Sequence, residues 1–491
     1  MNTTTKNNSI LSSKFIKILK SFSSDELKAF ELWLQSPWCN TNKTLIKLLG
    51  RIKKHHPQFD NNKLTKERLF QKILPNGKFS DRRMNNIFSE AYLAAEQFIV
   101  FQHLLNNQNL QADLRVKEFQ NRNLEEWFFR DAQKEIDRME NIQIKSWENH
   151  LELFQMYQQT YLHPGKNPKI QSGGITVAKM GRALDMVYLL EKAAIINEKI
   201  FRNRILKNED HDIQTELKKW YAACDGIEHL SIELYKIRFS YTDENMLQSY
   251  LQLRKVFIKK FDLLNPKEQK MHLFWLLNDT SYLARKKEID NSERFPLYQK
   301  GLNSGVLFHN GKLTNITYYS IISASNTLKK FDFSFDFIEK YTSTLDEKHQ
   351  LDGKFWGLAH TFYRKEELEK AIDLLIGHNF KIYFFQLASR LLTSQVYFDL
   401  FLQNEKYQFY LLNYFDSFEK WLSREKIHSK SNQKPYIRFV QICRKLAKAY
   451  SNVNFEMSMI ENLLESRESI QAPIWLAQKI EDVIQLKRGR R

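Results

Sequence analysis

The scarcity of glycine and proline is the sequence feature that most constrains how this chain can fold. Only 14 Gly and 9 Pro occur in 491 residues, whereas 13% of the residues are aromatic. Strand-rich folds need a turn about every 8–12 residues, and Gly and Pro are the main turn residues. The sequence therefore predicts an all-α fold of long helices.

The chain is also too long for one compact core, because domains usually hold about 100–200 residues. Changes in pattern along the chain predict three regions. These are a basic N-terminal helical domain over 1–105, a middle helical region over 106–310 and C-terminal helix pairs over 311–491.

Capping signals locate the helices of the N-terminal region. Ser23 and Glu26 are spaced as a capping box, and Leu27, Phe30 and Leu34 then follow one helical face. Other helices are expected near 12–22, 43–55, 64–74 and 80–101, the last two capped by Thr65 and Ser80.

The middle region carries a clear apolar stripe at helical spacing and one irregular stretch. The stripe consists of Tyr250, Leu253, Phe257, Phe261 and Leu264. A long helix is expected over 177–206, preceded by an irregular loop over 163–181 that contains Ser172-Gly173-Gly174. Free amides at a helix start attract phosphate, but phosphate loops normally follow a strand. A connecting loop is therefore the favoured interpretation, and a small-ligand loop is the alternative.

The C-terminal region shows the best internal order. Large and small residues alternate at helical spacing at Phe355, Leu358, Ala359, Phe362, Ala371 and Leu375. A weaker copy, offset by 37 residues, contains Tyr318, Ile321, Ile322, Ser334 and Ile338. This spacing resembles the tetratricopeptide repeat, a helix pair of about 34 residues, although the final proline and the first-helix glycine of that repeat are missing.

The resemblance implies stacked antiparallel helix pairs, an α-solenoid similar to tetratricopeptide-repeat proteins, with a groove that binds a peptide or a partner helix. The N-terminal pattern SPWCN, followed by a basic helical stretch, is similar to bacterial helical proteins without an assigned function. That second resemblance implies no site residue.

Cysteine usage and hydropathy indicate a cytoplasmic protein. The three cysteines lie far apart and form no CxxC motif, which suits a reducing compartment. The N-terminal residues contain no apolar run of signal-peptide length, and no stretch of about 18 apolar residues occurs anywhere. We therefore expect no membrane association.

Catalytic and metal-binding motifs are absent from the sequence. No HExxH, GxxxxGK[ST], GxSxG or GxGxxG occurs, and His55-His56 is the only adjacent histidine pair. We interpret that pair as a basic helix end rather than a metal site. Cys443 shares an apolar stripe with Phe439, Leu446 and Tyr450, which is typical of a buried thiol rather than a nucleophile. The sequence predicts no enzyme, no cofactor, no metal and no small-molecule substrate.

The strongest functional signal is a basic stretch over 43–83. It holds twelve Lys and Arg against three acidic residues, which is half of the net charge of +18. It has the order helix, turn, helix, and helix-turn-helix proteins read DNA with the first residues of their second helix. The candidate anion or nucleic-acid contacts are Arg51, Lys53, Lys54, Lys63, Lys66, Arg68, Lys72, Lys78, Arg82 and Arg83.

Two functional hypotheses follow from these patterns. The first is a non-catalytic helical-repeat scaffold that mediates protein–protein interaction, with a protein partner in its groove. The second is a nucleic-acid-binding protein that acts through the basic stretch. A solvated basic face is the third interpretation of this charge, because an AT-rich coding sequence enriches lysine without selection for binding.

Overall fold

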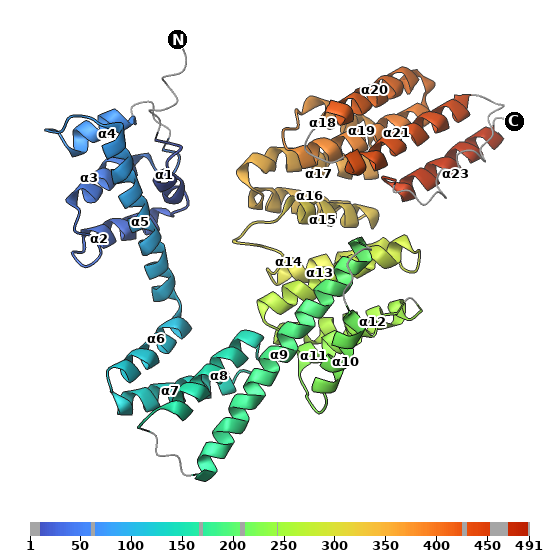
Figure 1. Ribbon diagram of the computed structural model, residues 1–491. Coiled ribbons are helices and arrows are strands. Elements are labelled where there is room, and N and C mark those ends of the chain that lie inside the picture. Colours follow the sequence, from blue (N-terminus) through green and yellow to red (C-terminus); the bar gives the residue numbers. More distant parts are fainter. Residues whose placement is uncertain are drawn as a thin grey trace. The chain divides into compact units, whose positions relative to one another are not determined.

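The computed structural model describes residues 10–59, 64–165, 170–206, 212–242, 244–424, 430–451 and 470–489 (Figure 1). These residues form helices joined by turns, with no strand among them, so the prediction of an all-α protein is confirmed. Contacts between residues divide the chain into two compact units, Met1–Tyr188 and Leu189–Arg491. The finer division into three regions stays a prediction.

The first unit contains the helices α1 (Lys14–Leu19), α2 (Ser24–Gln35), α3 (Lys43–Ile52), α4 (Lys66–Ile73), α5 (Asp81–Asn106), α6 (Gln108–Asn121), α7 (Glu125–Glu140), α8 (Trp147–Leu162) and the beginning of α9 (Ile170–Leu206). A short 3-10 turn, η2 (Lys53–His55), extends α3.

The second unit contains the end of α9 and then α10 (Ile213–Ala223), α11 (Leu230–Phe239), α12 (Met246–Lys260), α13 (Pro266–Arg285), α14 (Arg294–Asn303), α15 (Asn315–Thr327), α16 (Phe331–Tyr341), α17 (Glu347–Arg364), α18 (Leu368–Gly377), α19 (Tyr383–Gln403), α20 (Gln408–Arg424), α21 (Lys430–Ser451) and α23 (Pro473–Gly489). Its 3-10 turns are η3 (Phe261–Leu263), η4 (Asn291–Glu293), η5 (Thr342–Thr344) and η6 (Glu405–Tyr407).

The capping predictions for the N-terminal helices are confirmed. The Ser23 hydroxyl accepts a hydrogen bond from the Glu26 amide, and the Glu26 carboxylate accepts one from the Ser23 amide. At the start of α4 the Thr65 hydroxyl accepts a hydrogen bond from the Arg68 amide, and at the start of α5 the Ser80 hydroxyl accepts one from the Arg83 amide. Each cap satisfies a backbone amide that has no partner inside the helix, and the helix begins where the sequence indicates.

Helix α5 organises the first core, because α1, α2, α3 and α4 all pack against it. The rings of Phe15, Phe30, Phe88 and Phe98 meet there with centroid separations between 5.1 and 6.5 Å. A second core joins α6, α7 and α8 around Phe128. Leu48 of α3 and Leu69 of α4 are buried in the first core, so the basic helices α3, α4 and α5 pack in one group.

The predicted loop over 163–181 is wrong in its second half, because α9 begins at Ile170 and not near residue 177. Two consecutive glycines weaken a helix by about 1 kcal/mol each. Extending an existing long helix by about two turns is easier than nucleating a new one, and this offsets that cost. Lys179, which falls in the stretch expected as a loop, pairs with Glu140 at 2.7 Å from within the helix.

The C-terminal helices pack against their neighbours in the sequence and against the next helix but one. Helix α15 packs on α16, α17 on α18 and α19 on α20, while α15 also contacts α17 and α17 contacts α19. Ala359 of α17 and Ala371 of α18, the small residues of the repeat-like pattern, are fully buried. Tyr318, Ile321 and Ile322 of the upstream copy are buried as well.

Candidate interaction surfaces

The basic residues predicted as anion contacts fall on three helices that pack together in the first unit. Arg51 lies on α3, Lys53 and Lys54 lie on η2, and Lys66, Arg68 and Lys72 lie on α4. Lys78 precedes α5, whose first turn carries Arg82 and Arg83 as expected, and Lys63 lies outside the described residues.

Three of these side chains are already engaged within the protein. The Lys53 ammonium lies 2.6 Å from Glu31, the Lys66 ammonium lies 3.0 Å from Asp81, and the Arg83 guanidinium lies 5.7 Å from the centre of the Phe70 ring. The other six described candidates are exposed and form no ion pair with a described residue. They are Arg51, Lys54, Arg68, Lys72, Lys78 and Arg82.

The connection between α4 and α5 departs from helix-turn-helix geometry. It runs over residues 74–80, whereas the recognition turn of that motif has about three or four residues. Phe79 anchors the connection by placing its ring 5.6 Å from the ring of Phe70. The structure therefore brings the basic residues onto one domain without the short turn that sets a recognition helix in the major groove.

Cys443 and His56, which the sequence analysis considered as a nucleophile and as part of a metal-binding pair, pack against other residues of the protein. Cys443 is completely buried on α21 with Phe439 and Leu446, and burial raises the pKa of its thiol well above the usual value. That environment disfavours the thiolate, as the sequence pattern predicts for a core cysteine. His56 places Nε2 2.8 Å from the carbonyl oxygen of Phe22 and packs against Phe59.

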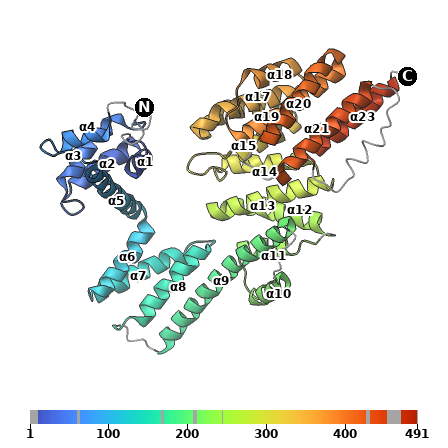
Figure 2. The same cartoon turned by 45° about the horizontal axis from the view of Figure 1, so that its top comes forward.

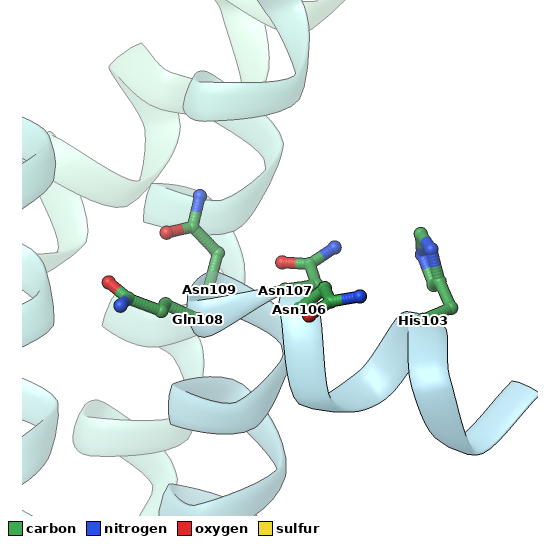
Figure 3. Close-up of a pocket in the computed structure, with 5 residues that line it drawn as sticks. All are labelled: His103, Asn106, Asn107, Gln108 and Asn109. Carbon is green, nitrogen blue, oxygen red and sulfur yellow. The ribbon is translucent and has the colours of Figure 1, made fainter. Parts of the chain in front are cut away.

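A shallow hollow of about 400 Å³ lies where α5 meets α6 (Figure 3). It is lined by His103 and by four amide side chains, Asn106, Asn107, Gln108 and Asn109. Figure 3 shows Gln108 pointing away from His103, on the other side of Asn106 and Asn107. The oxygen of Asn107 already caps α6 by accepting from the Leu110 amide at 3.0 Å. These side chains do not converge on a common point.

A second hollow of about 280 Å³ lies among α6, α7 and α8 and is acidic. Its lining includes the carboxylates of Asp113, Glu135 and Glu152 together with Arg138. Glu135 pairs with Arg138 at 2.7 Å. Burial raises the pKa of Glu152; Arg138 opposes this rise, and the nearby Asp113 and Glu135 add to it. Among the described residues, no group of three or more His, Cys, Asp or Glu side chains is arranged to hold a metal ion.

The second unit contains a buried charged centre that joins three helices. Arg238 of α11 donates to Asn197 of α9 and to Asp279 of α13, and its guanidinium lies 4.9 Å from the centre of the Trp275 ring. His272 is fully buried beside Trp275, and neither of its ring nitrogens has a hydrogen-bond partner among the described residues. Burial, reinforced by the Arg238 charge, lowers the pKa of His272 to about 3.

Among the C-terminal helices we call α15, α17, α19 and α21 the first helices and α16, α18 and α20 the second helices. A further surface lies on the first helices. We call first-helix face the side of α17, α19 and α21 that carries Tyr363, Phe398, Asp399 and Phe439. The second helices α16 and α18 pack against α17, and α20 packs against α19 and α21. Helix α23 packs on α21 (Figure 2). From α23, the Trp475 ring lies 5.6 Å from Phe398 and 5.7 Å from Phe439 between ring centres.

Polar groups complete this contact. The Trp475 indole donates to the Tyr363 hydroxyl at 2.7 Å, and that hydroxyl donates to the Asp399 carboxylate at 2.7 Å. The Lys479 ammonium lies 2.8 Å from both Asp399 and Asp482. Burial raises the pKa of Asp399, and the Lys479 charge opposes that rise.

Sequence reasoning missed this face because its residues come from segments about 35–110 positions apart. The signal available in the sequence was a Trp and a Lys four residues apart on the helix over 473–489, since positions i and i+4 share a helical side. Their partners Tyr363 and Asp399 carry no local pattern that would link them to that helix.

Together the described helices and their contacts define an all-helical protein. Its described helices include none with the length and apolar character needed to cross a membrane. Comparison with known proteins found no matching family model, no matching curated protein and no matching solved structure.

Proposed function

We propose that this protein is a non-catalytic scaffold whose C-terminal helix pairs, similar to tetratricopeptide repeats, bind partner proteins. The observation that carries the proposal is the contact between the first-helix face and α23. A layer of first helices accepts a separate amphipathic helix through apolar side chains and specific polar anchors. Helix-in-groove recognition uses the same combination of contacts.

Exposed side chains of the first helices provide the test of this function. Leu351, near the beginning of α17, is 64% exposed, whereas Ile376 of α18 is 62% exposed but belongs to a second helix. Leu351 lies about 120° around α17 from Tyr363, so it samples the exposed surface of a first helix outside the contact with α23. The two positions match in exposure and apolar character and differ in the helix that carries them.

We would place the photo-crosslinking residue benzoylphenylalanine at position 351 or position 376 of the full chain and irradiate native lysate. The proposal predicts a discrete crosslinked partner from position 351 and none above background from position 376. Equal capture from both positions, or no capture from position 351, would refute the scaffold proposal.

A second candidate function is nucleic-acid binding by the basic helices α3, α4 and α5. The observation that favours it is the set of six exposed basic side chains that have no ion pair with a described residue. Phosphate contacts release counterions, so such binding must weaken steeply between about 50 and about 200 mM salt.

A mobility-shift assay across that salt range tests the second candidate. Glu substitutions at Lys54, Arg68 and Arg82 are expected to abolish the shift. The matched control carries Glu at the exposed Lys434, Lys445 and Lys448 of α21, in the other unit. A shift that survives the three substitutions would exclude this surface as a nucleic-acid site.

A further inference from the structure

Helix α23 occupies the open side of the first-helix layer. Its Trp475 contacts α17 through Tyr363, α19 through Phe398 and α21 through Phe439. The other neighbours of these first helices are α18, which packs on α17 and α19, and α20, which packs on α19 and α21. Side chains of α23 therefore contact three first helices at once, while the helix itself packs on α21.

The apolar side of α23 is seated on this face as a bound amphipathic helix would be. Leu476, Ile480 and Val483 are buried, and their spacing follows one side of a helix. Ile474 and Leu486, which lie on other sides of the same helix, are exposed. The protein thus buries one defined stripe of α23 and leaves the rest open to solvent.

The polar anchors make the face selective for the helix that it accepts. Asp399 is largely buried, and Lys479 of α23 supplies the cation at 2.8 Å. A buried carboxylate that loses its cation is strongly unfavourable, so an acceptable helix must present a cation at this position. Four residues earlier it must present a donor to the Tyr363 hydroxyl, which Trp475 provides at 2.7 Å.

Helix α23 belongs to the same chain as the face that it covers. Helix α21 ends at Ser451 and α23 begins at Pro473, so 21 residues of sequence separate them. Because both are parts of one chain, the face meets α23 at a higher effective concentration than it meets a separate partner.

We propose that α23 is an internal ligand of the first-helix face, and that a helix of a partner protein carrying Trp and Lys at positions i and i+4 displaces it. This inference rests on the proposed scaffold function and names both its partner class and its regulation. While α23 is seated, the face is closed to partners. A partner helix gains access only by competing with α23 for Tyr363 and Asp399.

A fluorescein-labelled synthetic peptide with the sequence of residues 470–489 serves as the probe, and binding to the full chain is followed by anisotropy. In the variant Lys479→Glu, a carboxylate faces Asp399 and α23 is released. We expect the peptide to bind this variant with a Kd at least tenfold lower than for the wild-type chain. Trp475→Ala, which removes the indole donor and its ring contacts, is a second release variant with the same expectation.

Two controls separate release of α23 from general effects of charge or folding. Lys448→Glu makes the same charge change at an exposed position of α21 and is expected to bind the peptide as the wild type does. A peptide that itself carries Lys479→Glu is expected to lose at least tenfold in affinity for the released chain. Circular dichroism of each full-chain variant establishes that its helical content is unchanged.

Three results would overturn the inference. The first is equal peptide affinity for the wild type and both release variants. The second is no peptide binding to either release variant at unchanged helical content. The third is a dimer of the wild-type chain in sedimentation that Lys479→Glu dissociates, which would identify α23 of a second copy as the occupant. None of these results depends on crosslinking from position 351, so the scaffold function stands or falls separately.

Discussion

Replacing the buried His272 with leucine is expected to remove a specific loss of stability at mildly acidic pH. The imidazole is enclosed by the rings of Tyr235, Phe257 and Trp275, and its nitrogens have no hydrogen-bond partner among the described residues. The folded protein therefore holds this side chain neutral. Leucine has a similar volume and no proton to bind.

The magnitude follows from the difference in pKa between the two states. An unfolded histidine has a pKa near 6.5, whereas burial, reinforced by the charge of Arg238, lowers the pKa of folded His272 to about 3. Between these values the unfolded chain binds more protons than the folded chain, so stability falls as the pH falls. Each pH unit below about 6.5 corresponds to about 1.4 kcal/mol, and at about pH 5 the loss from His272 is about 2 kcal/mol.

Local hydrogen exchange measures this effect in a chain with two units. Exchange of α13 amides in the wild type and in His272→Leu, at about pH 7 and about pH 5 and corrected for the intrinsic rates, yields a local opening free energy. We expect the wild type to lose about 2 kcal/mol more than the variant on acidification. Amides of α5, in the unit without His272, are the internal control and should respond equally in both proteins.

His360 is a second buried histidine that makes stability sensitive to acid, and both the wild type and His272→Leu retain it. Burial, with a contribution from the Arg364 charge, lowers its pKa to about 3 as well. Some acid destabilisation should therefore remain in the variant. An identical pH dependence of α13 in wild type and variant would refute the reasoning that burial keeps His272 neutral.

Three further predictions concern single contacts. Arg238→Met should destabilise the second unit by about 3–5 kcal/mol, because Asp279 loses its buried guanidinium, and the double variant with Asp279→Leu should recover part of that loss in denaturant titrations. Ser23→Ala should cost about 1 kcal/mol in the same assay by removing the capping box of α2, whereas Ser21→Ala at the end of α1 serves as a control of smaller effect. Among the cysteines, only Cys39 should react quickly with a thiol reagent in the native state, since the other two are fully buried; fast labelling of three thiols would contradict this packing.

Much of the helical structure could be predicted because the signals that define a helix are local. The capping box at Ser23 and the caps at Thr65 and Ser80 lie within four residues of the groups that they bind. The stripe from Tyr250 to Leu264 is buried throughout, as its period indicates. Local signals also explain the error at 163–181, where the glycines favoured a loop but the adjoining helix extended over them.

The candidate surfaces were only partly accessible to the same reasoning. The basic stretch was visible as a run of charge, but its pairing was not, since Lys53 binds Glu31 and Arg83 lies on Phe70. Whether a lysine is free or paired depends on the side chains that neighbouring helices bring to it. The number of exposed charges available to a ligand therefore required coordinates.

The sequence by itself determined the class of protein, because helix formation depends on backbone preferences and apolar periodicity within a few residues. It determined the starts of the capped helices and the burial of Cys443 for the same reason. Only the tertiary structure decided that Lys479 meets Asp399, 80 positions away, and that Trp475 meets Tyr363 and Phe439. Such encounters depend on how all helices bury their apolar sides together, and no local stretch of residues specifies that arrangement.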